Sequence, residues 1–364
     1  MLHKFARYVA ASTVLLILAG SFVTSTDSGL SVPDWPTTYG WNMFTFPPSK
    51  WVGGIFYEHG HRLIASTVGF LTIILAAWIW FADSRRWLRW FGVGALASVV
   101  AQGILGGLTV IYLLPAPVST AHAGLAEIFF CMTVAIALFT SPGWIEGYGD
   151  TGVEDRTLRR AATMSTVVIF TQILVGATMR HTGAGLAIPD FPWMFGHVIP
   201  DHWSAAIAVH FAHRLGALIV IAMVFATSLY VWRWHQDRPE LARPATLIMF
   251  LVIVQVTLGA LTVISRRDPL VNSLHVVVGA LVLTTSLLLT LRSWRVRFGH
   301  TVRLKPDTTS HSVQNDAAAV RSVRLSASAP TDSDGATARP SRSAQREGWQ
   351  PDQTALHADH RGRA

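Results

Sequence analysis

The chain has 364 residues, of which 51% are hydrophobic and only 14% charged, and its formal net charge is +8. Soluble domains have about a quarter of their residues charged, so this composition excludes an ordinary soluble protein. The arginines are scattered along the edges of apolar runs and form no basic patch, which excludes nucleic acid as a partner. The single cysteine, Cys131, excludes an intrachain disulfide and a thiolate metal cluster.

Eight apolar runs are each long enough to cross a hydrocarbon core of roughly 30 Å. They cover residues 8–24, 52–81, 88–111, 118–140, 158–180, 203–232, 244–265 and 270–291. The first run follows Lys4 and Arg7 and also has the form of a cleavable signal peptide, but the repeat described below favours a retained helix. We therefore predict an all-α, polytopic protein of the lipid bilayer with eight transmembrane helices.

Basic residues gather in alternate connections between these runs, which predicts the orientation of the chain. They are Lys4, Arg7, Arg85, Arg86, Arg89, Arg156, Arg159, Arg160, Arg233, Arg238, Arg243, Arg292, Arg295 and Arg297. The intervening loops 25–51, 112–117 and 181–202 contain only Lys50. Because basic loops remain cytoplasmic, we predict that both termini are cytoplasmic.

An internal repeat divides the chain into two halves. GLSVPDWP (29–36) returns as GLAIPDFP (185–192), EHGHRL (58–63) as HFAHRL (210–215), QGILGGLTV (102–110) as QVTLGALTV (255–263), and AHAGLAE (121–127) as LHVVVGA (274–280). Four matches at nearly constant offset predict two parallel four-helix-bundle repeats, because each half crosses the membrane an even number of times.

The predicted parts of the chain follow from this repeat. Residues 1–141 form the first half, 142–157 a cytoplasmic linker and 158–292 the second half. Residues 293–364 are rich in Ser, Ala, Asp, Thr and Arg without apolar periodicity, and we predict a disordered cytoplasmic tail. Repeated glycines, such as Gly106 and Gly259, are attributed to close helix packing.

Four histidines occupy repeat-related places near the outer ends of the second, fourth, sixth and eighth runs: His61, His122, His213 and His275. An ionisable group inside a membrane is costly and usually functional. One such histidine alone is explained by an interhelical hydrogen bond, but four at duplicated positions favour metal ligands. Two pairs, one in each half, suit iron bound from both faces of a haem, whereas zinc more often has four clustered ligands that include Cys or carboxylate.

One position distinguishes the halves. Glu58 lies three residues before His61, whereas His210 lies three residues before His213. A carboxyl group one helical turn from an iron ligand suits acid–base chemistry or the stabilisation of a cation. The alternative is a residue at the outer interface that faces water. His59 is offset from this face, and we assign it no role.

Several arginines lie on the predicted outer side, where a guanidinium group can bind a haem propionate bidentately. Arg180, Arg266 and Arg267 are candidates for this contact, and Arg266 and Arg267 are exceptions to the charge bias. Arg62 and Arg214 directly follow their histidines and either serve likewise or form ion pairs within the bundle. Asp34 and Asp190, each after a proline in the repeated loops, are expected to fix turns or cap helices.

These motifs together resemble the haem A synthase family. The resemblance rests on Glu-x-x-His-Arg at 58–62, His-Arg at 213–214, the single His122 and His275, and the two GL-x-x-PD-x-P loops, and it covers about residues 8–292. It implies a bacterial plasma-membrane enzyme that oxidises the C8 methyl group of haem O to the formyl group of haem A through hydroxylated intermediates. Implied partners are haem O synthase and assembly factors of haem-copper oxidases.

The resemblance also implies roles for the residues of the two halves. His61 and His122 would hold the substrate haem O, with Glu58 as the catalytic carboxylate, and His213 and His275 would hold a haem b cofactor that relays electrons. Some members carry a cysteine pair in the outer loops of the first half, which this chain lacks. A redox role for such a pair therefore does not carry over.

Two other classes of protein use the same histidines. A two-haem membrane cytochrome b that only carries electrons needs all four but has no need of Glu58. A transporter with parallel repeats would use them as proton-relay groups. The absence of acidic residues from the cytoplasmic halves of the spans counts against a proton path across the membrane.

Overall fold

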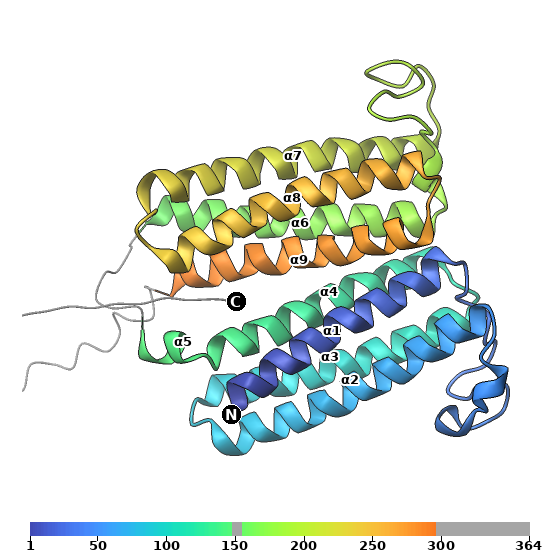
Figure 1. The fold of residues 1–364 in the computed structure, drawn as a ribbon, viewed down its shortest axis with the longest axis horizontal. Coiled ribbons are helices and arrows are strands. Elements are labelled where there is room, and N and C mark those ends of the chain that lie inside the picture. Colours follow the sequence, from blue (N-terminus) through green and yellow to red (C-terminus); the bar gives the residue numbers. More distant parts are fainter. Residues whose placement is uncertain (148–154, 296–364) are drawn as a thin grey trace, which may run out of the picture. The chain divides into compact units, whose positions relative to one another are not determined.

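The computed structural model describes residues 1–147 and 155–295 (Figure 1). Its helices are α1 (Leu2–Ser25), α2 (Gly54–Ala82), α3 (Arg86–Ile111), α4 (Ala116–Phe139), α5 (Pro142–Glu146), α6 (Arg156–His181), α7 (Ala205–Trp234), α8 (Pro239–Ile264) and α9 (Pro269–Trp294), with short 3-10 helices at Met43–Thr45, Pro48–Lys50 and Ala184–Leu186. No β-strand occurs within these ranges. The predicted tail lies outside the described residues, apart from its first three.

All helices but α5 and the 3-10 helices are long and apolar enough to cross a membrane. This confirms the prediction of an all-α protein with eight transmembrane helices. Polar caps begin several of them: Asp155 accepts from the N–H of Leu158 at α6, and Asp268 accepts from the N–H groups of Leu270 and Val271 at α9. Such caps satisfy N–H groups that the first helical turn leaves unpaired.

The transmembrane helices form two four-helix halves, α1–α4 and α6–α9 (Figure 1). Within each half the helices pack in a closed ring, so that α2 and α4 are diagonal to each other, as are α7 and α9. The halves meet through α1 against α9, α4 against α6 and α4 against α9. Since α1 corresponds to α6 and α4 to α9, these contacts follow the twofold relation that the sequence repeat predicts.

The start of one transmembrane helix differs from the prediction for an identifiable reason. The seventh transmembrane helix, α8, begins at Pro239 instead of residue 244 and includes Pro244. A proline inside a helix frees the carbonyl four residues earlier, here that of Glu240. Arg292 of α9 donates to this carbonyl at 2.8 Å, so the first turn of α8 is retained. The short α5 lies in the predicted linker.

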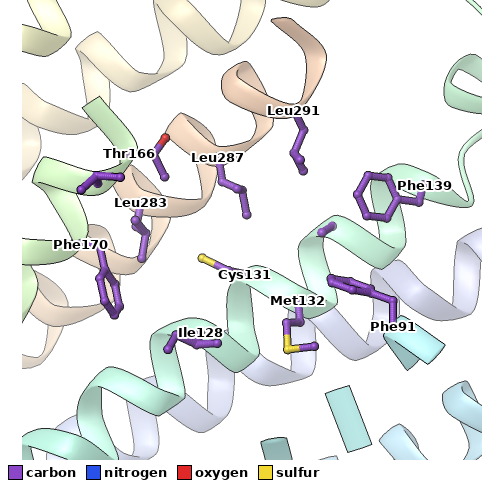
Figure 2. A pocket seen from close by; sticks show the side chains of 12 residues that line it. Phe91, Ile128, Cys131, Met132, Phe139, Thr166, Phe170, Leu283, Leu287 and Leu291 are labelled. Atoms are coloured by element: carbon purple, nitrogen blue, oxygen red, sulfur yellow. The ribbon is translucent and has the colours of Figure 1, made fainter. Parts of the chain in front are cut away.

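A hollow of about 440 Å³ lies between the two halves, where α3 and α4 face α6 and α9 (Figure 2). Its lining is apolar except for Thr166, and the sulfur of Cys131 points into it. It is lined by residues near the start of α3 and the ends of α4 and α9, such as Phe91, Phe139 and Leu291. No histidine lines it, so the predicted ligands lie elsewhere.

Candidate functional site

The four predicted histidine ligands lie near one end of the helical bundle. This end, the loop end, carries the long loops 26–53 and 182–204 (Figure 1). His61 of α2, His122 of α4, His213 of α7 and His275 of α9 each lie within about two to three turns of the start of their helix. Each pair therefore lies on the diagonal helices of one half, the arrangement that can ligate a metal from two sides.

The second-half pair has the spacing of two ligands to one metal. The ring centroids of His213 and His275 lie 6.5 Å apart, with their planes at 74°. A metal bound at about 2 Å by one nitrogen of each of two imidazoles places the ring centres roughly 6 Å apart. The geometry therefore fits an ion between the rings.

The Nδ1 atoms of this pair face neighbouring helices. Nδ1 of His275 lies 3.1 Å from the carbonyl oxygen of Gln255 in α8, and Nδ1 of His213 lies 3.0 Å from the side-chain amide nitrogen of Gln172 in α6. The amide nitrogen of Gln255 also lies 3.4 Å from Nε2 of His275. The carbonyl of Gln255 can accept from Nδ1–H of His275, which orients that ring and leaves its Nε2 as the candidate metal ligand, whereas Nδ1 of His213 accepts from the Gln172 amide.

In the first half, the Nδ1 atoms of His61 and His122 have different surroundings. His61 and His122 are close enough to interact electrostatically, and the carbonyls of Leu16 and Gln102 lie next to their rings. Nevertheless, the buried Nδ1 atoms of His61 and His122 make no hydrogen bond in the described part of the chain. Buried polar atoms are normally satisfied, so these two are where a bound group is expected to order the site.

Each histidine ring lies against a glycine of an adjacent helix. A methyl group added to the glycine would lie 2.8–3.1 Å from Cε1 of the ring. The pairs are Gly20 with His61, Gly106 with His122, Gly176 with His213, and Gly259 with His275. Alanine at any of these four positions would therefore crowd the ring. Gly106 and Gly259, which the sequence analysis attributed to close helix packing, thus lie against candidate ligands. Gly20 and Gly176 were not predicted.

The donor set fits haem better than a metal bound by protein alone. Within residues 1–147 and 155–295, no group of three or more His, Cys, Asp or Glu side chains could hold a metal ion. Haem supplies four nitrogen ligands from its macrocycle and needs only one or two from the protein. His61 with His122, and His213 with His275, are the residues that could hold one haem in each half.

Glu58 lies in α2 one turn before His61 and is buried, with 3% of its surface exposed. Its Oε2 accepts from the N–H of Val32 at 2.8 Å, and its Oε1 forms an ion pair with Arg62 at 2.6 Å. This burial excludes the alternative of a side chain that faces water. Glu58 thus ties the loop 26–53 to α2, a structural role that the sequence did not predict.

Arg62 completes this tie. Its guanidinium group donates to the carbonyls of Val32, Asp34 and Thr37 as well as to Glu58. The alternative of an ion pair within the bundle therefore matches its contacts in the structure. A propionate contact of Arg62 stays a prediction.

The second half repeats this tie with a different side chain. His210 takes the place of Glu58: its Nδ1 accepts from the N–H of Ile188 at 3.2 Å, and Nε of Arg214 lies 3.2 Å from its Nε2. Arg214 donates to the carbonyls of Ile188 and Asp190. The position therefore anchors the loop in both halves, but only the first half has a carboxylate there.

The aspartates of the repeated loops fix turns, as predicted. Asp34 accepts from the N–H groups of Tyr39 and Gly40 and from the hydroxyl of Thr37, and Asp190 accepts from two N–H groups in the same way. Burial raises the pKa of Asp34, but these hydrogen bonds outweigh it and hold the pKa below 3.8. Their stabilisation is therefore present at neutral pH and is lost only as the pH falls through this lowered pKa.

The remaining candidate arginines belong to the second half and have no basic counterpart in the first. Arg180 corresponds to Thr24 in the repeat, and the adjacent Arg266 and Arg267 correspond to two leucines at 113–114. The turn at residues 113–114 and the turn at residues 266–267 both have positive φ angles, in the left-handed region. Arg180 donates to the carbonyl of Ser21 at 2.8 Å and interacts electrostatically with His275.

A further ion pair joins the turn after α8 to the turn after α1. Arg267 lies 3.7 Å from Asp27 and interacts electrostatically with Arg180. Arg180 therefore brings a positive charge near His275, and the equivalent position in the first half is the uncharged Thr24. This asymmetry is what an anionic ligand of the second half would recognise.

Comparison with known proteins identifies the family of the chain. A family model described as cytochrome oxidase assembly protein (COX15-CtaA) matches residues 48–287. The chain belongs to this family. The matched range includes all four histidines and Glu58.

The similar curated proteins include the following three, each named heme A synthase. The one from Symbiobacterium thermophilum is 29% identical over 277 residues, covering 73% of this chain and 87% of the relative. The one from Shouchella clausii is 26% identical over 277 residues, covering 74% and 89%. The one from Geobacillus thermodenitrificans is 25% identical over 338 residues, covering 90% and 98%.

The contact between glycine and histidine predicts the effect of a single methyl group. Gly176→Ala should lower the haem content of the purified protein roughly tenfold, because the added Cβ displaces the ring of His213 at a cost of about 1–3 kcal/mol. Gly103→Ala, at a helical glycine with open space around it, is the control and should retain haem. Haem per protein, measured from absorption spectra, would contradict the account if Gly176→Ala matched the wild type.

Proposed function

We propose that the chain is a haem A synthase, an oxidoreductase that converts the C8 methyl group of haem O to a formyl group through hydroxylated intermediates. Membership of the cytochrome oxidase assembly family and relatives named heme A synthase support this activity. The observation that carries the proposal is a duplicated bis-histidine site in which only one copy has a buried carboxylate beside its ligands.

The two halves then have different tasks. The first half binds the substrate haem O through His61 and His122, and the second half binds haem b through His213 and His275. Among the described residues, the two buried carboxyl groups, Glu58 and Glu127, belong to the first half, and the repeat places His210 and Ala280 at the equivalent positions of the second. Conversely, the positive charge of Arg180 near His275 suits the propionates of a permanently bound cofactor.

Haem b, when bound, supplies one-electron relay. Conversion of a methyl to a formyl group with one oxygen atom from water removes four protons and four electrons, and the electrons would pass to an external electron acceptor. Positive charge develops near the methyl carbon when an electron leaves before its proton. Glu58 would stabilise this charge or accept a proton from the attacking water. Its hydrogen bonds to Val32 and Arg62 hold the carboxylate in one orientation, and a carboxylate retains lone pairs for a further bond.

The proposed location is a bacterial plasma membrane with both termini cytoplasmic and the loop end outside. Exchange of haems with haem O synthase and with assembly factors of haem-copper oxidases would take place from this membrane. The distribution of arginine supports the orientation. The four histidines then lie in the outer half of the bilayer.

Lys50 offers a test of this orientation, because loops 26–53 and 182–204 contain no other lysine or arginine. Lys50 is exposed at the end of a 3-10 helix. Trypsin added to right-side-out membrane vesicles should cut after Lys50 and separate a fragment of residues 1–50, which α1 keeps in the membrane, from the rest of the chain, and Lys50→Gln should abolish this cut. Cleavage at Lys50 in inverted vesicles alone would reverse the orientation.

The catalytic role of Glu58 can be separated from its structural role by using the residue of the other half. Glu58→His should preserve the hydrogen bond to the loop, as His210 does, and should therefore leave haem binding and the rate of trypsin cleavage at Lys50 near those of the wild type. Haem A formation in cells supplied with haem O should fall at least roughly a hundredfold, within the range that general acid–base catalysis contributes. Haem composition would be measured by extraction and mass analysis.

The matched control is His210→Glu, which places a carboxylate in the second half and should leave haem A formation largely intact. Near-normal haem A from Glu58→His would remove Glu58 from the catalytic residues. A two-haem electron carrier, which uses the same histidines, would be favoured only if the wild type also formed no haem A.

A further inference from the structure

A second buried carboxyl group, that of Glu127, has no part in the proposed reaction. Glu127 lies near the middle of α4 and is 5% exposed, and its Oε2 makes no hydrogen bond within the described residues. The repeat places Ala280 at the equivalent position of α9, so the second half has an apolar side chain there. Buried polar atoms almost always have a partner, and an exception points to a functional role.

Glu127 lies on the face of α4 that is turned toward the second half. A Cβ added at Gly124 would lie 2.8 Å from Cδ2 of Leu174 in α6, and the sulfur of Cys131 points into the hollow between the halves (Figure 2). Glu127 follows Gly124 by three residues and precedes Cys131 by four, spacings that place side chains on one helix face. Glu127 and Cys131 also interact electrostatically. The carboxyl group therefore lies where the two halves meet.

Within the described residues, no charged group of a neighbouring helix lies at the depth of Glu127. The helices packed against α4 are α1, α3, α5, α6 and α9, and their charged and titratable residues all lie within about two turns of a helix end. These residues are His3, Lys4, Arg7 and Tyr8 of α1, Arg86 and Arg89 of α3, Glu146 of α5, Arg156, Arg159, Arg160, Arg180 and His181 of α6, and His275 and Arg292 of α9. In α4 itself, the other titratable residues are His122 and Cys131. Glu127 thus has no ion-pair partner among them.

This isolation sets a condition on the charge of Glu127. An ionised carboxylate is costly in the low-dielectric interior of a membrane protein unless a positive charge lies nearby. A bound haem supplies a positive charge that depends on its oxidation state: ferric iron leaves one net positive charge on the macrocycle, and reduction removes it. A nearby positive charge favours the ionised form of a carboxyl group, and loss of that charge favours the protonated form.

We propose that Glu127 is a redox-linked proton acceptor, which binds a proton when haem b in the second half is reduced and releases it when haem b is oxidised again. This inference rests on the proposed function for the placement of haem b. One electron from the substrate reaches the iron and one proton from water reaches the carboxylate, and both leave when the electron passes to the external acceptor. The net charge buried between the halves is then the same in both oxidation states.

The first test is an infrared difference spectrum between reduced and oxidised haem b in the purified protein. Reduction should produce the C=O stretching band of a protonated carboxyl group, and Glu127→Gln should lose this band. Glu127→Asp, which keeps a carboxyl group, should show the band at a shifted frequency, and Glu58→Gln should show it as in the wild type. Absence of the band from the wild type, or its persistence in Glu127→Gln, would overturn the proposal.

The second test is the pH dependence of the midpoint potential of haem b. Because proton binding and reduction favour each other, the potential of the wild type should fall as the pH rises, and the slope should be at least halved in Glu127→Gln. Glu127→Ala, which introduces the residue of the second half, gives the same test if Glu127→Gln fails to bind haem b. A wild-type slope in a variant that retains haem b would overturn the proposal.

Both tests are equilibrium measurements that need no turnover, so they separate this inference from the proposed function. A wild type that binds haem b and shows the carboxyl band but forms no haem A would contradict the proposed function and leave the role of Glu127 intact.

Discussion

The close approach of four imidazole rings to the backbone of neighbouring helices is the constraint on which the site depends. A helix surface ordinarily presents a Cβ at every position, and the rings of His61, His122, His213 and His275 occupy the space where that atom would lie. Glycine is the residue that permits this approach. Each ring is therefore fixed between two helices, which links the separation of those helices to the position of the candidate ligands.

The two halves share this packing of histidine against glycine because they are duplicates of one unit. They differ at the position that anchors the outer loop. The same position of α2 and α7 ties an outer loop to its helix, through Glu58 in one half and His210 in the other. A carboxylate has two oxygens that both accept, whereas a neutral imidazole has one acceptor nitrogen. The exchange therefore leaves the loop anchored in both halves while confining a negative charge to one of them.

Much of the fold was predictable because its signals are local. Apolar length predicts the transmembrane helices, and the constant offset of the repeats predicts the two halves and the correspondence of Glu58 with His210. The start of α8 was not predictable, since the carbonyl of Glu240, which Pro244 leaves without its helical partner, accepts from Arg292 of another helix. Such a tertiary contact leaves no periodic signal.

Only part of the candidate site was predictable from the sequence. The histidines follow from repetition, but the contacts of Arg62 and Arg214 with loop carbonyls depend on how each loop folds back on its helix. The glycines could have been paired with the histidines only in part, because Gly20 and Gly176 lie outside the longer repeated motifs. Their offset of 156 residues matches that of the GL-x-x-PD loops, and this was the available signal.

The central claim is that one half holds a substrate haem and the other a cofactor haem. Extraction and mass analysis of the haems in protein purified from cells that also make haem O test it most directly. The account predicts haem b together with haem O, its hydroxylated derivative or haem A in the same preparation. Haem b as the sole haem, at two per chain, would contradict it.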